Sequence, residues 1–218
     1  MYYKLTDGCK FILSVHVDDY IMGYEDEKYF EAFIAHFQET IQMTCKREID
    51  FMLQIKLEWT DSSVSLSQNR QIESLKKKFN ACDSKRVFTT PMETKLKLAM
   101  GDANNLPDVP YRESGVCSLL FIARYTRPDI LFVVTLLCRF LTNYTEVHWK
   151  AATRVLCYTA STTYRVLFYT PNVKAPALEL YTDSDWGSDQ IDGRSTTAVW
   201  QSCYLVYREA NKCCSLYK

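Results

Sequence analysis

The sequence is poor in the features that mark membrane-spanning and secreted proteins. No apolar run approaches the roughly 20 residues that a membrane-spanning helix needs. The first ten residues mix Tyr, Lys, Asp and Gly before a short apolar stretch, which is not the pattern of a secretory signal peptide. We therefore expect an intracellular chain, cytoplasmic or nuclear, that is not secreted and does not bind a membrane.

Histidine is scarce and cysteine is scattered. The chain has three histidines and nine cysteines, no Cys-x-x-Cys pair occurs, and the histidines lie far from neighbouring cysteines. A zinc site or a disulfide framework would need regular spacing. Free thiols in a reducing compartment are therefore the favoured interpretation.

Net charge is also lacking, because 26 basic residues balance 26 acidic ones in the 218 residues. No overall field attracts the chain to nucleic acid, so any such attraction has to be local. Residues 70–97 carry eight basic residues against three acidic ones. Within them Lys76, Lys77 and Lys78 are candidate nucleic-acid contacts, although a lysine-rich helix face in solvent is the alternative interpretation.

Hydrophobic periodicity predicts an α/β (α+β) chain. Short apolar runs, several of them alternating, predict strands at 11–17, 20–24, 51–59, 64–66, 165–169, 178–182 and 198–207. Apolar residues at helical spacing predict helices at 27–43, 67–79, 111–125, 129–141 and 146–159. Prolines, a glycine and weak periodicity make 80–110 the best linker candidate.

The pair Asp18-Asp19 lies at the turn of the first predicted hairpin. Two adjacent carboxylates are unfavourable unless water solvates them or a cation shares them, and hard oxygen ligands select Mg²⁺ or Mn²⁺. In two-metal phosphoryl transfer, carboxylates hold ions about 3.5–4 Å apart. Asp-Asp at a turn is common, however, so a solvated turn remains the alternative.

A second candidate metal ligand is Asp183, which follows the predicted strand 178–182 and precedes a turn of small residues. An aspartate in that place can hold a metal when two or three further carboxylates come from elsewhere in the chain. Taken alone, the pattern equally fits a solvated loop.

Five stretches in order resemble the Pol polyprotein of copia-type LTR retrotransposons. They are HVDDYIMGY, LSQNRQIESLKKKFNACDSKRVFTTPME, YRESGVCSLLFIARYTRPDI, HWKAATRVLCY and YTDSDWGSDQIDGRSTT. The resemblance runs through nearly the whole chain. In that family the first stretch matches the Tyr-Val-Asp-Asp hairpin of the reverse transcriptase palm, whose aspartates bind the catalytic Mg²⁺. The resemblance therefore implies metal-binding roles for Asp18 and Asp19.

The same resemblance implies a fold: a partial palm, a helical thumb and connection, and a truncated RNase H-like mixed sheet. It implies three domains at 1–98, 99–170 and 171–218, with the hairpin 51–66 near the primer terminus and the helix 67–79 as the first thumb element. Residues 126–130 resemble the connection, and Asp183 matches the first metal-binding carboxylate of RNase H. The partners of the intact enzyme are an RNA or DNA template-primer and a deoxynucleoside triphosphate.

Departures from the family predict a chain that is inactive by itself. The family's fingers and a further palm aspartate would precede Met1, and later RNase H carboxylates would follow Lys218. Gln54 and Cys117 stand where the family has glycine, which suggests relaxed selection. Two alternatives stay open: a noncatalytic remnant that binds nucleic acid or a partner, with association through exposed sheet edges, or a decayed insertion with no selected role.

Overall fold

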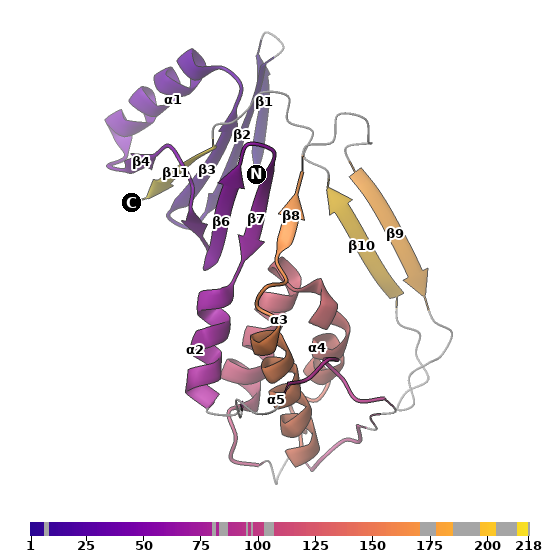
Figure 1. The fold of residues 1–218 in the computed structure, drawn as a ribbon. Helices are drawn as coiled ribbons and strands as arrows, with labels where there is room; N and C mark the ends of the chain where they lie inside the picture. The colour runs from indigo at the N-terminus through magenta and orange to yellow at the C-terminus, as the bar shows by residue number, and fades with distance from the viewer. Residues whose placement is uncertain are drawn as a thin grey trace.

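Strands and helices largely occupy different parts of the molecule, as Figure 1 shows with the sheets above and most helices below. The structure is a computed structural model. It describes residues 1–6, 9–79, 82, 87–94, 96, 98–102, 107–170, 178–184, 197–203 and 213–217. Within these ranges no helix is both long and apolar enough to cross a bilayer. The predicted α/β class is confirmed.

The first sheet contains the hairpin that the sequence predicts. Its strands run in the order β1 (Tyr2–Thr6), β2 (Cys9–His16), β3 (Asp19–Tyr24), β11 (Cys213–Tyr217) and β4 (Thr44–Lys46), each antiparallel to its neighbour. Helix α1 (Glu27–Thr40) packs on one face, and the carboxylate of Asp26 accepts the N–H of Lys28 at its start. Phe30 and Ile34 of α1 are buried in the same cluster as Phe11 and Met22 of the sheet.

The second sheet joins segments that lie a hundred residues apart in the sequence. It contains β5 (Phe51–Met52), β6 (Ile55–Thr60), β7 (Ser63–Ser67) and β8 (Leu167–Tyr169) in that order. Among the described residues, strands β9 (Leu178–Ser184) and β10 (Thr197–Cys203) pair only with each other. The described parts of the late strands therefore do not form one common sheet. Strand β8 pairs instead with the edge of β7, with Leu66 opposite Leu167.

The helices after α1 share one hydrophobic core. They are α2 (Asn69–Phe79), a π-helical turn (Tyr111–Val116), α3 (Cys117–Tyr125), a 3₁₀ turn (Pro128–Ile130), α4 (Leu131–Cys138) and α5 (Glu146–Ser161). Ile72 and Leu75 of α2 are buried in the same cluster as Ile122, Leu137 and Val155. The expected helices are thus present, but a π-helical turn precedes α3 and a 3₁₀ turn precedes α4. The division into three domains stays a prediction.

The predicted linker lies against these helices. Its described residues form no helix or strand, yet Phe88 and Met92 pack on the helical core. The guanidinium of Arg154 lies 4.5 Å from the centre of the Phe88 ring, and Arg154 also donates to Glu93 at 3.2 Å. A disulfide joins Cys82 to Cys157 of α5. The expectation of free thiols is therefore wrong for this pair, whose partners are 75 residues apart and show no pairing signal in the sequence.

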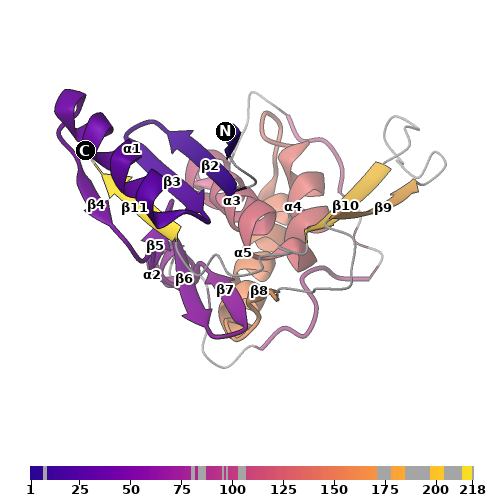
Figure 2. The same cartoon turned by 90° about the horizontal axis from the view of Figure 1, so that it is seen from above.

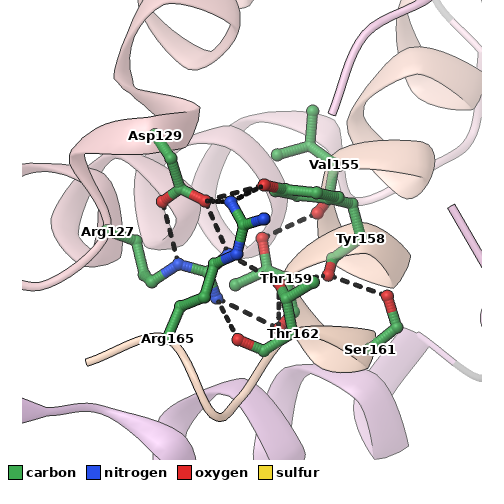
Figure 3. Close-up of polar contacts among 8 residues, drawn as sticks. All are labelled: Arg127, Asp129, Val155, Tyr158, Thr159, Ser161, Thr162 and Arg165. Atoms are coloured by element: carbon green, nitrogen blue, oxygen red, sulfur yellow. Dashed lines mark hydrogen bonds and ion pairs between the residues drawn. The ribbon is translucent and has the colours of Figure 1, made fainter. Parts of the chain in front are cut away.

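A buried arginine joins the start of the 3₁₀ turn to the end of α5 (Figure 3). The guanidinium of Arg127 donates to both carboxylate oxygens of Asp129, at 2.9 and 2.8 Å, and to the carbonyls of Thr159 and Thr162 at 3.2 Å each. Burial opposes ionisation of Asp129, but the hydrogen bonds and charge of Arg127 outweigh it. The pKa of Asp129 therefore lies below its usual value. We call Arg127, Asp129, Thr159 and Thr162 the Arg127 cluster.

The buried imidazole of His148 makes stability depend on pH. Its Nδ1 accepts the N–H of Thr145 at 2.9 Å, which completes a capping box at the start of α5, and burial lowers its pKa below 6.5. A neutral group of this kind contributes stability above its unfolded pKa, and that contribution is lost as the pH falls below about 6.5. Glutamine at 148 could accept the same N–H without titrating.

We therefore expect the free energy of unfolding to fall more steeply from about pH 7 to about pH 5 in the wild type than in His148→Gln. Urea unfolding in small pH steps measures both slopes. Equal slopes in the two proteins would show that His148 does not titrate with folding.

Candidate functional site

The hairpin turn that carries the two aspartates is tight. His16 pairs with Asp19, so only Val17 and Asp18 form the loop. Val17 has a φ of 53°, in the left-handed region that a β-branched residue rarely adopts. A positive φ at the first loop position is typical of a type II′ hairpin turn. The turn thus sets Asp18 at the tip of the hairpin and Asp19 at the first position of β3.

Aromatic side chains near both ends of β3 pack against α1. Tyr20, which directly follows Asp19, meets Phe37 of α1 edge to face with ring centres 5.6 Å apart. Tyr24 at the other end of β3 stacks on Phe30 at 4.0 Å. Asp18 is exposed and Asp19 is partly buried. The two carboxylates are therefore available at the rim of a well-packed sheet.

The described residues do not complete a two-metal centre. Among them no group of three His, Cys, Asp or Glu side chains lies close enough to hold a metal ion. Mg²⁺ needs about six oxygen ligands, and two carboxylates supply only part of them. Asp183 lies in β9, opposite Ala198 of β10, and β9 lies well away from the β2–β3 hairpin in both Figure 1 and Figure 2. The structure therefore places Asp183 apart from Asp18 and Asp19, and the resemblance assigns it to a different metal site.

The three predicted lysines lie at the end of α2 but do not share a face. Lys77 and Lys78 are exposed and Lys76 is partly buried. Successive residues of a helix are about 100° apart around its axis, so the three side chains leave it in different directions. Lys78 lines a pocket.

That pocket has a volume of about 280 Å³ and lies between α2 and the β5–β6 hairpin. Arg70, Ser74 and Lys78 line it from one face of α2, because they are spaced four residues apart. The guanidinium of Arg70 lies 5.4 Å from the centre of the Phe51 ring. Two cations beside a hydroxyl suit an anion such as a phosphate. Sequence reasoning missed Arg70, although its spacing from Lys78 was a usable signal.

The positive charge of Arg70 also acts on Asp50, an acidic residue near the pocket. A hydrogen bond from Lys46 is the main cause that holds the pKa of Asp50 below its usual value, and the charge of Arg70 adds to the effect. Asp50 is therefore ionised at neutral pH and competes with any anionic ligand for Arg70.

Gln54 lines the same pocket with strained backbone. Its φ is 63°, and the preceding Leu53 has a φ of 47°. At position 54 the resembled family has glycine, the residue that adopts such angles without strain. Cys117, which also stands where the family has glycine, has an ordinary helical φ of −64°. Of these two replacements, only the one at 54 therefore carries a conformational cost.

Gln54→Gly is therefore expected to raise the free energy of unfolding by about 1 kcal/mol, because it removes a left-handed non-glycine residue. Cys117→Gly is the matched control and should lower it by a similar amount, because glycine weakens a helix. Urea unfolding of both variants tests the pair. Stabilisation by Cys117→Gly, or none by Gln54→Gly, would contradict the strain argument.

Comparison with known proteins shows which of them the chain is similar to. No family model matches the chain, and no solved structure matches it. Curated relatives do. The chain is 30% identical over 195 residues to the retrovirus-related Pol polyprotein from transposon RE1 of Arabidopsis thaliana, and 31% identical over 207 residues to that from transposon TNT 1-94 of Nicotiana tabacum.

These matches cover 89 and 90% of this chain but only 13 and 15% of the relatives. An uncharacterized mitochondrial protein of Arabidopsis thaliana is 27% identical over 202 residues, which are 92% of this chain and 82% of that protein. The resemblance drawn from the five sequence stretches is confirmed. The chain is homologous to one segment of the Pol polyproteins of copia-type retrotransposons.

Proposed function

We propose that the chain is the part of a reverse transcriptase that carries Asp18 and Asp19, two of the metal-binding carboxylates of the palm. The single observation behind this is the tight β2–β3 turn, which sets both carboxylates at the rim of a sheet covered by α1. The relation to retrotransposon Pol polyproteins supports the same assignment. Helix α2 is then the first thumb element, and Asp183 belongs to the beginning of RNase H.

In this proposal the chain alone does not copy a template. Two-metal phosphoryl transfer needs carboxylates that clamp both ions, and among the described residues no group of three His, Cys, Asp or Glu side chains could hold a metal ion. Mg²⁺ or Mn²⁺ bound at Asp18 and Asp19 would supply the electrostatic stabilisation of the reacting phosphate. The chain's own part is to hold those two aspartates on a rigid hairpin.

Template-primed incorporation of deoxynucleotides by the purified chain tests this. The expected result is incorporation at the background level, equal in the wild type and in Asp18→Asn. Incorporation above background that disappears in Asp18→Asn would contradict the proposal that the chain is inactive alone, while it would strengthen the assignment of Asp18.

A second candidate function is binding of nucleic acid without catalysis. The pocket of Arg70, Ser74 and Lys78 favours it, because this pocket collects two cations on one helix face. Such binding comes mainly from phosphate contacts and weakens steeply with salt. It would not need the missing carboxylates.

A plot of log K against log salt has a negative slope for such binding. Replacing Lys76, Lys77 and Lys78 by alanine should make this slope shallower by about 1 for each lysine that contacts a phosphate. Because the three lysines point in different directions, we expect Lys78→Ala to account for more of the change than Lys77→Ala. Fluorescence anisotropy with a labelled primer-template measures the slopes. Lys28→Ala, which removes an exposed lysine of α1, is the control. No binding at low salt would exclude this function.

A further inference from the structure

Strand β1 leaves one edge of the first sheet without a partner among the described residues. It is the outermost strand and pairs only with β2. Tyr2, Tyr3 and Leu5 are 68, 59 and 58% exposed. Soluble proteins usually protect such an edge with proline, bulges or several charges, whereas β1 contains no proline and a single charge, on Lys4.

A pocket of about 520 Å³ adjoins this edge, on the face of the sheet that α1 covers. Tyr2, Lys4 and Phe11 line it from the sheet, and Tyr29, Phe33 and Phe37 line it from α1. The ammonium of Lys4 lies 5.2 Å from the centre of the Tyr29 ring. The open edge and the aromatic pocket therefore form one continuous surface, because Tyr2 and Lys4 belong to both.

We propose that this surface binds a second copy of the chain, with β1 of each copy paired antiparallel across a two-fold axis. Two-fold dimers are the commonest oligomers, and they bring the same patch of both copies together. An axis perpendicular to the sheet joins the two sheets into one and puts both copies of α1 on the same face. Residues directly opposite each other must then both be even-numbered or both odd-numbered, since side chains alternate between faces.

Charge favours one register over its neighbour among those that the symmetry allows. With Tyr3 opposite the partner's Tyr3, Tyr2 lies opposite the partner's Lys4 on the α1 face. Lys4 then lies between its own Tyr29 and the partner's Tyr2, an arrangement that favours a cation. The neighbouring register would set Lys4 directly opposite the partner's Lys4, which is unfavourable. The first register also covers the pocket, because the three β1 residues that line it, Tyr2, Tyr3 and Lys4, all enter the pairing.

Sedimentation velocity over the micromolar range tests the dimer. The wild type is expected to show a reversible equilibrium between monomer and dimer. Tyr3→Lys sets two lysines face to face at the axis and should weaken the dimer at least about tenfold, as should Tyr3→Glu with two carboxylates. Tyr3 is mostly exposed, so both variants should keep the circular dichroism spectrum of the wild type.

Mixing the two variants provides the sharper experiment. Lysine then faces glutamate across the axis, and the mixture should dimerise more tightly than either variant alone. Phe168→Lys is the matched control, because Phe168 is an aromatic residue, 63% exposed, on the edge strand β8 of the other sheet. It should leave the dimer unchanged. A monomeric wild type, a mixture that stays monomeric, or loss of the dimer in Phe168→Lys would each overturn the proposal.

Discussion

Replacing Arg127 by alanine is expected to lower the free energy of unfolding by about 3–5 kcal/mol, because it breaks a buried ion pair. Arg127 is only 2% exposed. Its loss would leave the carboxylate of Asp129 without its bidentate partner. The carbonyls of Thr159 and Thr162 would lose the guanidinium but keep the N–H groups of Thr162 and Arg165 as donors.

Two further variants separate the buried arginine from the exposed charge beside it. Arg127→Lys keeps the charge but loses the planar fork, so it should still be clearly destabilising. Arg165, whose side chain is 48% exposed, lies 3.6 Å from the same carboxylate of Asp129. Arg165→Ala should therefore cost at most about 1 kcal/mol. Urea unfolding measures all three, and equal effects of Arg127→Ala and Arg165→Ala would contradict the assigned role of the Arg127 cluster.

Gly101→Val is expected to lower the free energy of unfolding by about 2–3 kcal/mol through overpacking. The N–H of Gly101 donates to the carbonyl of Asn143 at 2.8 Å, which brings the two backbones together. A Cβ atom at 101 would lie 2.6 Å from Cγ2 of Thr145 and 2.8 Å from the carbonyl oxygen of Asn143. The backbone oxygen cannot move away as a flexible side chain would.

Gly115 provides a graded comparison for this prediction. A Cβ atom there would lie 3.0 Å from the carbonyl oxygen of Pro110 and 3.4 Å from the ring of Trp149, which is less crowded than position 101. Gly115→Ala should therefore destabilise the fold less than Gly101→Ala. Thermal unfolding ranks the two, and the reverse order would show that residue 101 does not pack against the turn before α5.

Local patterns predicted the parts of the fold whose partners are near in sequence. The alternation at 11–17, followed by 20–24, predicts the β2–β3 hairpin, and the helical spacing of Phe30, Phe33 and Phe37 predicts α1. These signals are strong because strand pairing and helix packing use side chains only a few residues apart. The two aspartates are placed by the same local signal.

Contacts between distant segments could not be predicted in this way. The pairing of β8 with β7 depends on an edge that only the folded sheet presents. The segment 80–110 has no helical or strand period, so it was interpreted as a linker, whereas Phe88 and Met92 pack irregularly on the helical core. Arginine is usually exposed, and nothing in the sequence around Arg127 shows that Asp129 and the end of α5 together enclose its charge.

The basic site illustrates the same limit within one helix. Three consecutive lysines attract notice in a sequence, yet consecutive positions diverge around a helix. Arg70, Ser74 and Lys78 are spaced so that they share one face of α2. The β5–β6 hairpin, which lies beside that face, completes the pocket. The local pattern makes Asp183 a candidate metal ligand, and only the family resemblance assigns it to RNase H, so that role remains a proposal.

Paramagnetic broadening by Mn²⁺ tests the central claim that Asp18 and Asp19 form a metal-binding hairpin. In amide NMR spectra of the full chain, sub-stoichiometric Mn²⁺ should broaden the signals of residues 16–20 first and most strongly. The effect should vanish in Asp18→Asn and in Asp19→Asn, and it should persist in Glu39→Gln, which alters an exposed acid of α1. Broadening that begins elsewhere, or that survives removal of both aspartates, would contradict the claim.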